Sequence, residues 1–226
     1  MTAEPTETKT LELSAFDRAI FTGHGELTIT QGDRESLTLE THPDTLPKIK
    51  VEVVDGTLHV GQGRTLSDKI GFALQTSLTR KEIRYTLTVR KLASLELGGV
   101  FTAAARGLVA DGLSLKLTGP SQLRVEGLTS ETLHVDMPAA GMLAVDGSVA
   151  EQQVKLGGPG DYDAPRLNSK KASIVVSGPG RAAVWVSDQL DVNIRGIGSV
   201  EYYGSPKVHQ RISGIGSIAR LGESPR

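Results

Sequence analysis

A five-residue pattern recurs through the second half of the sequence at nearly constant spacing. Each copy reads apolar, variable, apolar, variable, glycine, and neighbouring copies start at nearly equal intervals. The copies are 95–99, 115–119, 133–137, 154–158, 174–178, 192–196 and 210–214. Met137 takes the glycine position of the third copy, and Gln210 takes the first apolar position of the last. A period of about 20 residues indicates a repeat protein, in which one unit cannot bury its apolar side without its neighbours.

A second short alternating segment follows the pattern in most units. Examples are Leu123–Val125 before Gly127 and Leu143–Val145 before Gly147. Because side chains alternate along a strand, each unit offers one apolar side, and units stacked about 4.8 Å apart would align these sides and pair their backbones. The glycine after each strand is expected to supply a positive φ at a corner, and proline follows it in three copies.

We therefore predict an all-β fold, a right-handed β-helix-like solenoid with coils of about 20 residues, although the sequence alone does not fix the handedness. A β-sandwich also has closely spaced strands, but it does not require a corner glycine at each of these intervals. A propeller repeat would be about twice as long. The solenoid predicts that one inward row stacks the following side chains: Leu117, Val135, Leu156, Val176 and Ile194.

The chain divides into three predicted parts. Residues 1–10 are polar and are expected to form a flexible tail, 11–221 to form a single domain, and 222–226 to form a second tail. Within the domain, 11–92 reads as an irregular N-terminal β part and 93–221 as regular coils. Asp55-Gly56 between two alternating segments predicts a hairpin. Leu66–Leu78 is less regular, and it could form a short helix or pack under a loop.

Composition excludes several classes of protein. Lys and Arg total 25 and Asp and Glu total 26, so the charge gives no reason to expect nucleic acid as a partner. There are no cysteines, which excludes disulfides and thiolate sites. No apolar run is long enough to insert in a membrane, and the N-terminus does not read as a signal peptide.

The search for catalytic or metal-binding chemistry gives few candidates. No Gly-x-Ser-x-Gly elbow is present, and the five histidines lack the spacing of a metal site. Stacked aspartates could bind Ca²⁺ in a β-helix polysaccharide lyase. Asp161 and Asp163 lie on the same side of one predicted strand, and Asp136 comes one coil earlier. The more economical interpretation is a charged outer face, so we predict no cofactor and no metal.

Exposed aromatic side chains are the remaining candidates for ligand binding. If Val184 and Val186 face the core, Trp185 faces outward, and Tyr203 lies one coil further along the chain. The two could be neighbours on one face, where an aromatic ring can stack on a sugar or anchor a protein. A register shift of one residue would bury them instead.

Several segments resemble one bacterial family. They are 194–208 and 211–218 near the end, 85–99 in the middle, and 16–20 and 27–32 near the start. In this order they resemble the "putative auto-transporter adhesin, head GIN domain" family over about residues 10–221. The resemblance implies a β-helix-like fold, an envelope or extracellular location, and a role in adhesion. The sequence departs from the family in lacking a leader and in Met137 at a corner, where a bulged turn is expected.

These observations predict a non-catalytic cell-envelope or surface module that binds a glycan or protein, or scaffolds, through an extended β-helix face. Self-association is a further expectation, because an end coil has unpaired backbone groups. Two alternatives stay open, a β-helix polysaccharide-active enzyme and a purely structural domain. The candidate ligand-binding residues are Trp185, Tyr203, Asp161 and Asp163.

Overall fold

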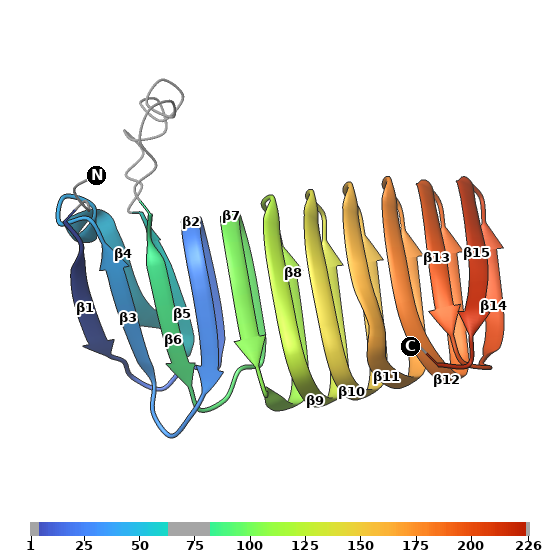
Figure 1. Cartoon of the computed structure of the whole chain (residues 1–226), viewed down its shortest axis with the longest axis horizontal. Helices are drawn as coiled ribbons and strands as arrows, with labels where there is room; N and C mark the ends of the chain where they lie inside the picture. The colour runs from blue at the N-terminus through green and yellow to red at the C-terminus, as the bar shows by residue number, and fades with distance from the viewer. Residues whose placement is uncertain (1–4, 63–81, 225–226) are drawn as a thin grey trace.

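The computed structural model describes residues 5–62 and 82–224, which form a β-solenoid with its coils stacked along one axis (Figure 1). Its elements are β1 (Glu7–Glu12), β2 (Arg18–Gln31), β3 (Ser36–Thr41), the 3₁₀ turn η1 (Leu46–Lys48), β4 (Ile49–Val54), β5 (Thr57–Gln62), β6 (Arg84–Val89), β7 (Ser94–Arg106), β8 (Val109–Leu117), β9 (Ser121–Met137), β10 (Gly141–Leu156), β11 (Gly160–Val176), β12 (Gly180–Ile194), β13 (Ile197–Tyr203), β14 (Lys207–Ile212) and β15 (Ile215–Gly222). The predicted β-solenoid and its coil length are confirmed, since register partners such as Gly160 and Gly180 lie one predicted period apart. Its right-handedness stays a prediction.

The coils from β7 onward pair in parallel, each with the next along the chain. β9, β10, β11 and β12 each supply most of one coil as a long strand of 15 to 17 residues that bends at a corner. At this bend Gly127 in β9 and Gly147 in β10 have φ of 69° and 125°, where a β-carbon would be strained, and Gly107, at the corner between β7 and β8, has a φ of 62°. The strand halves on either side of the bend face each other across the core.

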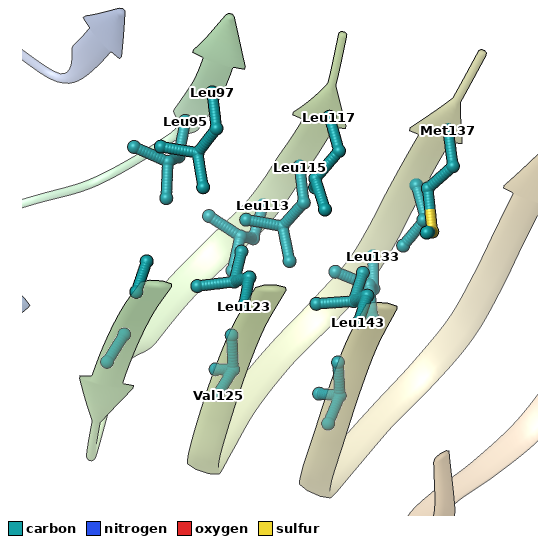
Figure 2. Close-up of a cluster of buried hydrophobic side chains, with 14 of the residues drawn as sticks. Leu95, Leu97, Leu113, Leu115, Leu117, Leu123, Val125, Leu133, Met137 and Leu143 are labelled. Atoms are coloured by element: carbon teal, nitrogen blue, oxygen red, sulfur yellow. The ribbon is translucent and has the colours of Figure 1, made fainter. Parts of the chain in front are cut away.

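The interior is a set of aliphatic rows that run from coil to coil. Figure 2 shows Leu97, Leu117 and Met137 repeating along the stack, with Leu123 and Leu143 approaching from the opposite strands. One row is Met137, Leu156, Val176, Ile194 and Ile212. Another is Leu95, Leu115, Val135, Val154, Ile174 and Val192.

The predicted single row is therefore correct except at Val135. Leu156, Val176 and Ile194 do stack, but Val135 belongs to the neighbouring row. The cause is the third copy of the sequence pattern. In the observed register it is 135–139, not 133–137, so Ala139 takes the corner position and Met137 is a buried core residue. The corner at 138–140 is as long as the one at 118–120, so the bulged turn expected there is absent.

The corner glycines of the pattern are needed for a different reason from the predicted one. The structure gives no positive φ for Gly99, Gly119 or Gly196. A β-carbon on Gly119 would lie 2.3 Å from the carbonyl oxygen of Gly99, and one on Gly196 would lie 2.3 Å from that of Ser177. Glycine therefore lets the corner of one coil approach the backbone of the coil before it.

The N-terminal end of the stack is closed by antiparallel strands. β3 pairs with β6, and β1 pairs with β3. Residues 7–10 were predicted as a tail, and this is wrong, because Glu7–Glu12 forms β1 by pairing with the distant segment Ser36–Thr41. β15 includes Gly222, which was assigned to the C-terminal tail. The predicted Asp55-Gly56 hairpin joins β4 to β5, whereas the helix considered for Leu66–Leu78 lies outside the described residues.

Candidate binding face

All four residues singled out from the sequence lie on one outer surface of the stack. We call it the A face: the outward side chains of the first halves of β9, β10, β11 and β12, and of β13. The strand register sorts these side chains into rows across the coils. The first two rows are Gln122, Met142, Asp161, Arg181 and Ser199, and Arg124, Ala144, Asp163, Ala183 and Glu201.

Trp185 and Tyr203 are direct register partners on neighbouring coils. Both lie at outward positions and both are half-buried. A β-carbon on Gly204 would lie 3.6 Å from Cδ1 of Trp185, so the indole rests beside this glycine corner. The two aromatic side chains thus cover part of the backbone while offering the rest of their surface to solvent.

Asp161 and Asp163 lie one coil before Trp185, on β11. Asp163 is exposed, and its register neighbours are Ala144 and Ala183. Asp161 is partly buried between Met142 and Arg181. Asp163 is therefore flanked by two small side chains, which leave space on both sides of its carboxylate.

A shallow hollow of about 30 Å³ opens over Ala144. Its polar lining is Arg124, Asp146, Asp163 and Arg166, and its apolar lining is Val125, Ala144, Val145 and Pro165. Asp146 is partly committed, because its Oδ1 accepts a hydrogen bond of 2.7 Å from the backbone N–H of Gly127. The hollow thus combines guanidinium donors, a carboxylate acceptor and an apolar floor.

A buried hydrogen-bond network lies beneath this face. Tyr162 Oη donates to Gln152 Oε1 at 2.9 Å, Gln152 Nε2 donates to Ser169 Oγ at 2.8 Å, and Ser169 Oγ donates to the carbonyl oxygen of Trp185 at 2.8 Å. Burial raises the pKa of the Tyr162 hydroxyl far above its ordinary value. The network ties the backbone at Trp185 to β10 and β11.

The structure brings together no metal-binding cluster. Among residues 5–62 and 82–224, no group of three His, Asp or Glu side chains could hold a metal ion. Asp136 was considered as a neighbour of Asp161 and Asp163, and this is wrong. Its register partners are Lys116 and Lys155, which lie in the second strand halves of their coils, opposite the A face.

Sequence reasoning did not find the residues of the hollow. Arg124 and Arg166 are ordinary charged residues in the sequence, and Pro165 and Arg166 lie where the register between β11 and β12 shifts. The signal in the sequence that could have located the hollow is the row in which the small residues Ala144 and Ala183 alternate with larger ones. Reading it requires the register of each coil.

Comparison with known proteins places the chain among bacterial β-solenoids. The family described as "Putative auto-transporter adhesin, head GIN domain" matches residues 15–206. No curated protein matches the sequence. No helix of the described residues is long and apolar enough to cross a bilayer.

Three solved structures share the fold. A putative adhesin from Bacteroides fragilis is 22% identical, with 97% of this chain and 98% of that one covered and a TM-score of 0.83. A putative lipid binding protein from Parabacteroides distasonis is 21% identical, with 96% of each chain covered and a TM-score of 0.72. A putative adhesin from the same species is 18% identical, with 96% and 97% covered and a TM-score of 0.69.

Proposed function

The chain belongs to the "Putative auto-transporter adhesin, head GIN domain" family, and from this premise we propose that it is a non-catalytic binding module of the cell surface or envelope. The A face is its binding surface, and a glycan is its ligand. The observation that carries this proposal is the in-register pair Trp185 and Tyr203 on the same face as the hollow over Ala144.

The chemistry of the A face suits a sugar. An aromatic side chain offers an apolar surface for the C–H side of a sugar ring, and it loses little conformational entropy on binding. Arg124 and Arg166 can donate to hydroxyl oxygens, and the carboxylate of Asp163 can accept from hydroxyl groups. Because these groups lie on paired strands, the spacing between them is set before the ligand arrives, which lowers the entropic cost of binding.

One structural neighbour is described as a putative lipid binding protein, but the interior of this chain is not where a lipid would bind. Its inward rows are packed, and side chains such as Leu117, Val176 and Ile194 are fully buried. A ligand of any class would therefore meet the outer faces.

The second candidate, a polysaccharide-active enzyme, is favoured by one observation. The hollow places Asp146 and Asp163 near Arg124 and Arg166, which is the combination of carboxylates and a cation that such an enzyme uses. Two measurements discriminate the candidates. An enzyme of this type would release products from pectin-like polymers, and Ca²⁺ would raise its Tm.

The binding proposal is tested by retention of the full chain on immobilised polysaccharides. We expect the double variant Trp185→Ala with Tyr203→Ala to lose at least about tenfold in apparent affinity, which corresponds to about 1.4 kcal/mol. The control is His134→Ala, an exposed ring on the opposite face. Equal retention of the double variant and the wild-type chain, with both folded by circular dichroism, would contradict the proposal.

A further inference from the structure

The C-terminal end of the stack leaves two strand edges open. Within the described part of the chain, β14 pairs only with β12, and β15 pairs only with β13. Figure 1 shows both strands at the end of the stack, with no strand beyond them. Ser213 donates its N–H to the carbonyl of Ile194 at 2.9 Å, and by the same alternation the carbonyl of Ile212 points to the open edge of β14. Edges of this kind pair readily with another chain.

Apolar side chains gather at this same end. Ile215 is 74% exposed, Leu221 47% and Ile212 42%. Ile212 is the last residue of the inward row that contains Ile194, so it is exposed at the end of this row although its side chain points inward. The opposite end differs, because the outermost strand β1 carries Glu7, Lys9 and Glu12, and charged edges discourage pairing.

We propose that the partner of this end is a second copy of the same chain, related by a two-fold axis through Ile218. The two β15 strands then pair antiparallel, and residues whose numbers sum to 436 lie opposite one another. In this register Ile218 meets its own copy on the inner side. Tyr202 pairs with Arg220 and Tyr203 with Gly222, so Leu221 is the extra residue of a bulge and the regular part of the new ladder runs from Gly216 to Arg220. Ser217 lies opposite Ala219, both exposed and small.

The backbone supports this register. Ile215 donates its N–H to Gly196 in the preceding coil at 3.0 Å, so by alternation Gly216, Ile218 and Arg220 direct their N–H and C=O groups toward the open edge. A rotation about Ile218 exchanges Gly216 with Arg220. The residues that face the edge therefore meet residues that also face it, as an antiparallel ladder requires. Glycine opposite Arg220 also leaves room for the larger side chain.

The second open strand fits the same axis. A β-carbon on Gly216 would lie 2.8 Å from Cγ2 of Ile194, and the row of Ile194 ends at Ile212. Gly216 on β15 therefore faces the end of β14 at Ile212. Two residues back along β14 and two forward along β15, Gln210 lies across from Ile218. A two-fold axis through both points pairs β14 with its copy about Gln210. It places Val208 opposite Ile212, both on the inner side.

The area of the coil end is sufficient for a specific contact. The end strand has eight residues at about 3.3 Å each, so the end surface is roughly 26 Å long. Its two strands lie about 10 Å apart, and with their outer side chains the surface is roughly 20 Å wide. The pair would bury about 1,000 Å² in total, which is the lower limit for a specific interface. An axis along the normal of the A face keeps both copies of this face on one side. If the proposed function holds, the dimer presents two copies of the Trp185–Tyr203 pair to one ligand surface, which increases avidity.

The test is the mass of the full chain by sedimentation velocity at up to about 0.5 mM, where a dimer with a Kd of about 10 µM is largely assembled. We expect twice the chain mass of 24.0 kDa. The variant Ser217→Lys with Ala219→Lys should sediment as a monomer, because each lysine faces a lysine of the partner. The matched variant Ser217→Glu with Ala219→Lys should stay dimeric, because opposite charges then face each other.

Three outcomes would overturn the proposal: a wild-type chain that is monomeric throughout the concentration range, a dimer unchanged by the two lysines, or two double variants with the same mass. Both positions are exposed, so neither variant disturbs the core. Glycan retention is measured separately on the monomeric variant. Loss of dimerisation with retained binding would leave the proposed function intact.

Discussion

Removing the Tyr162 hydroxyl tests whether the buried network stabilises the fold as a unit. Tyr162 and Gln152 are 1% and 0% exposed, so neither polar group can reach water. Tyr162→Phe leaves Oε1 of Gln152 buried without its donor. An unsatisfied buried acceptor costs about 1–3 kcal/mol, and we expect a loss of unfolding free energy in this range.

The companion variant is Gln152→Leu. Gln152 lies in an inward row between Leu133 and Ala172, so a leucine side chain fits the row. This variant leaves the Tyr162 hydroxyl unpaired and should also cost about 1–3 kcal/mol. The double variant removes both polar partners, while Ser169 keeps its bond to the Trp185 carbonyl. We therefore expect the double variant to lose at least about 1 kcal/mol less than the sum of the single losses.

The assay is urea unfolding followed by circular dichroism and by the fluorescence of Trp185, which is the single tryptophan. The two probes must give the same transition for a two-state free energy to apply. Losses that add within about 0.3–0.5 kcal/mol would show that the two groups act independently, and would refute the reasoning.

Two further predictions follow from the corners and the C-terminal end. Gly119→Ala should lower the unfolding free energy by about 1–3 kcal/mol, because its β-carbon would lie 2.3 Å from Gly99 O. Gly107→Ala, which meets no atom within 4 Å but has a φ of 62°, should cost only about 1 kcal/mol in the same urea titration. The Arg220 and Ser205 hydrogen bonds lower the pKa of Glu223, so their stabilisation is present above its ordinary pKa of 4.5 and is lost as the pH falls through the lowered value. Wild-type Tm should therefore fall more steeply on acidification than that of Glu223→Gln, and parallel Tm curves would contradict this.

The architecture could be predicted because the repeat encodes it locally. An alternating apolar strand followed by glycine specifies one rung, and near-constant spacing specifies that rungs stack. The misplaced third copy shows where this reasoning stops. In 133–139 the residues Leu133, Val135 and Met137 are all apolar and alternate, so two registers fit equally well. Only the pairing of Val135 with Leu115 and Val154 separates them.

The start of the domain was harder to predict because its contacts are distant. β1 is polar and mostly exposed, and it forms by pairing with β3 and not by burying a face of its own. A polar strand at an edge has the composition of a tail. Its structure therefore follows from the neighbouring strand, which local composition does not encode.

The candidate site depends on a property that a one-dimensional pattern does not contain. Alternation predicts that Trp185 and Tyr203 point outward, but their pairing requires the two coils to be in register. Coil length is not constant along the stack, and the register between β11 and β12 shifts after Ala164. The shift brings Asn168, and not Pro165, beside Trp185, which leaves Pro165 and Arg166 to line the hollow. Inward rows tolerate such shifts because any aliphatic side chain fills them, whereas a binding face is altered by each one. The core of a solenoid is therefore more predictable from sequence than its function.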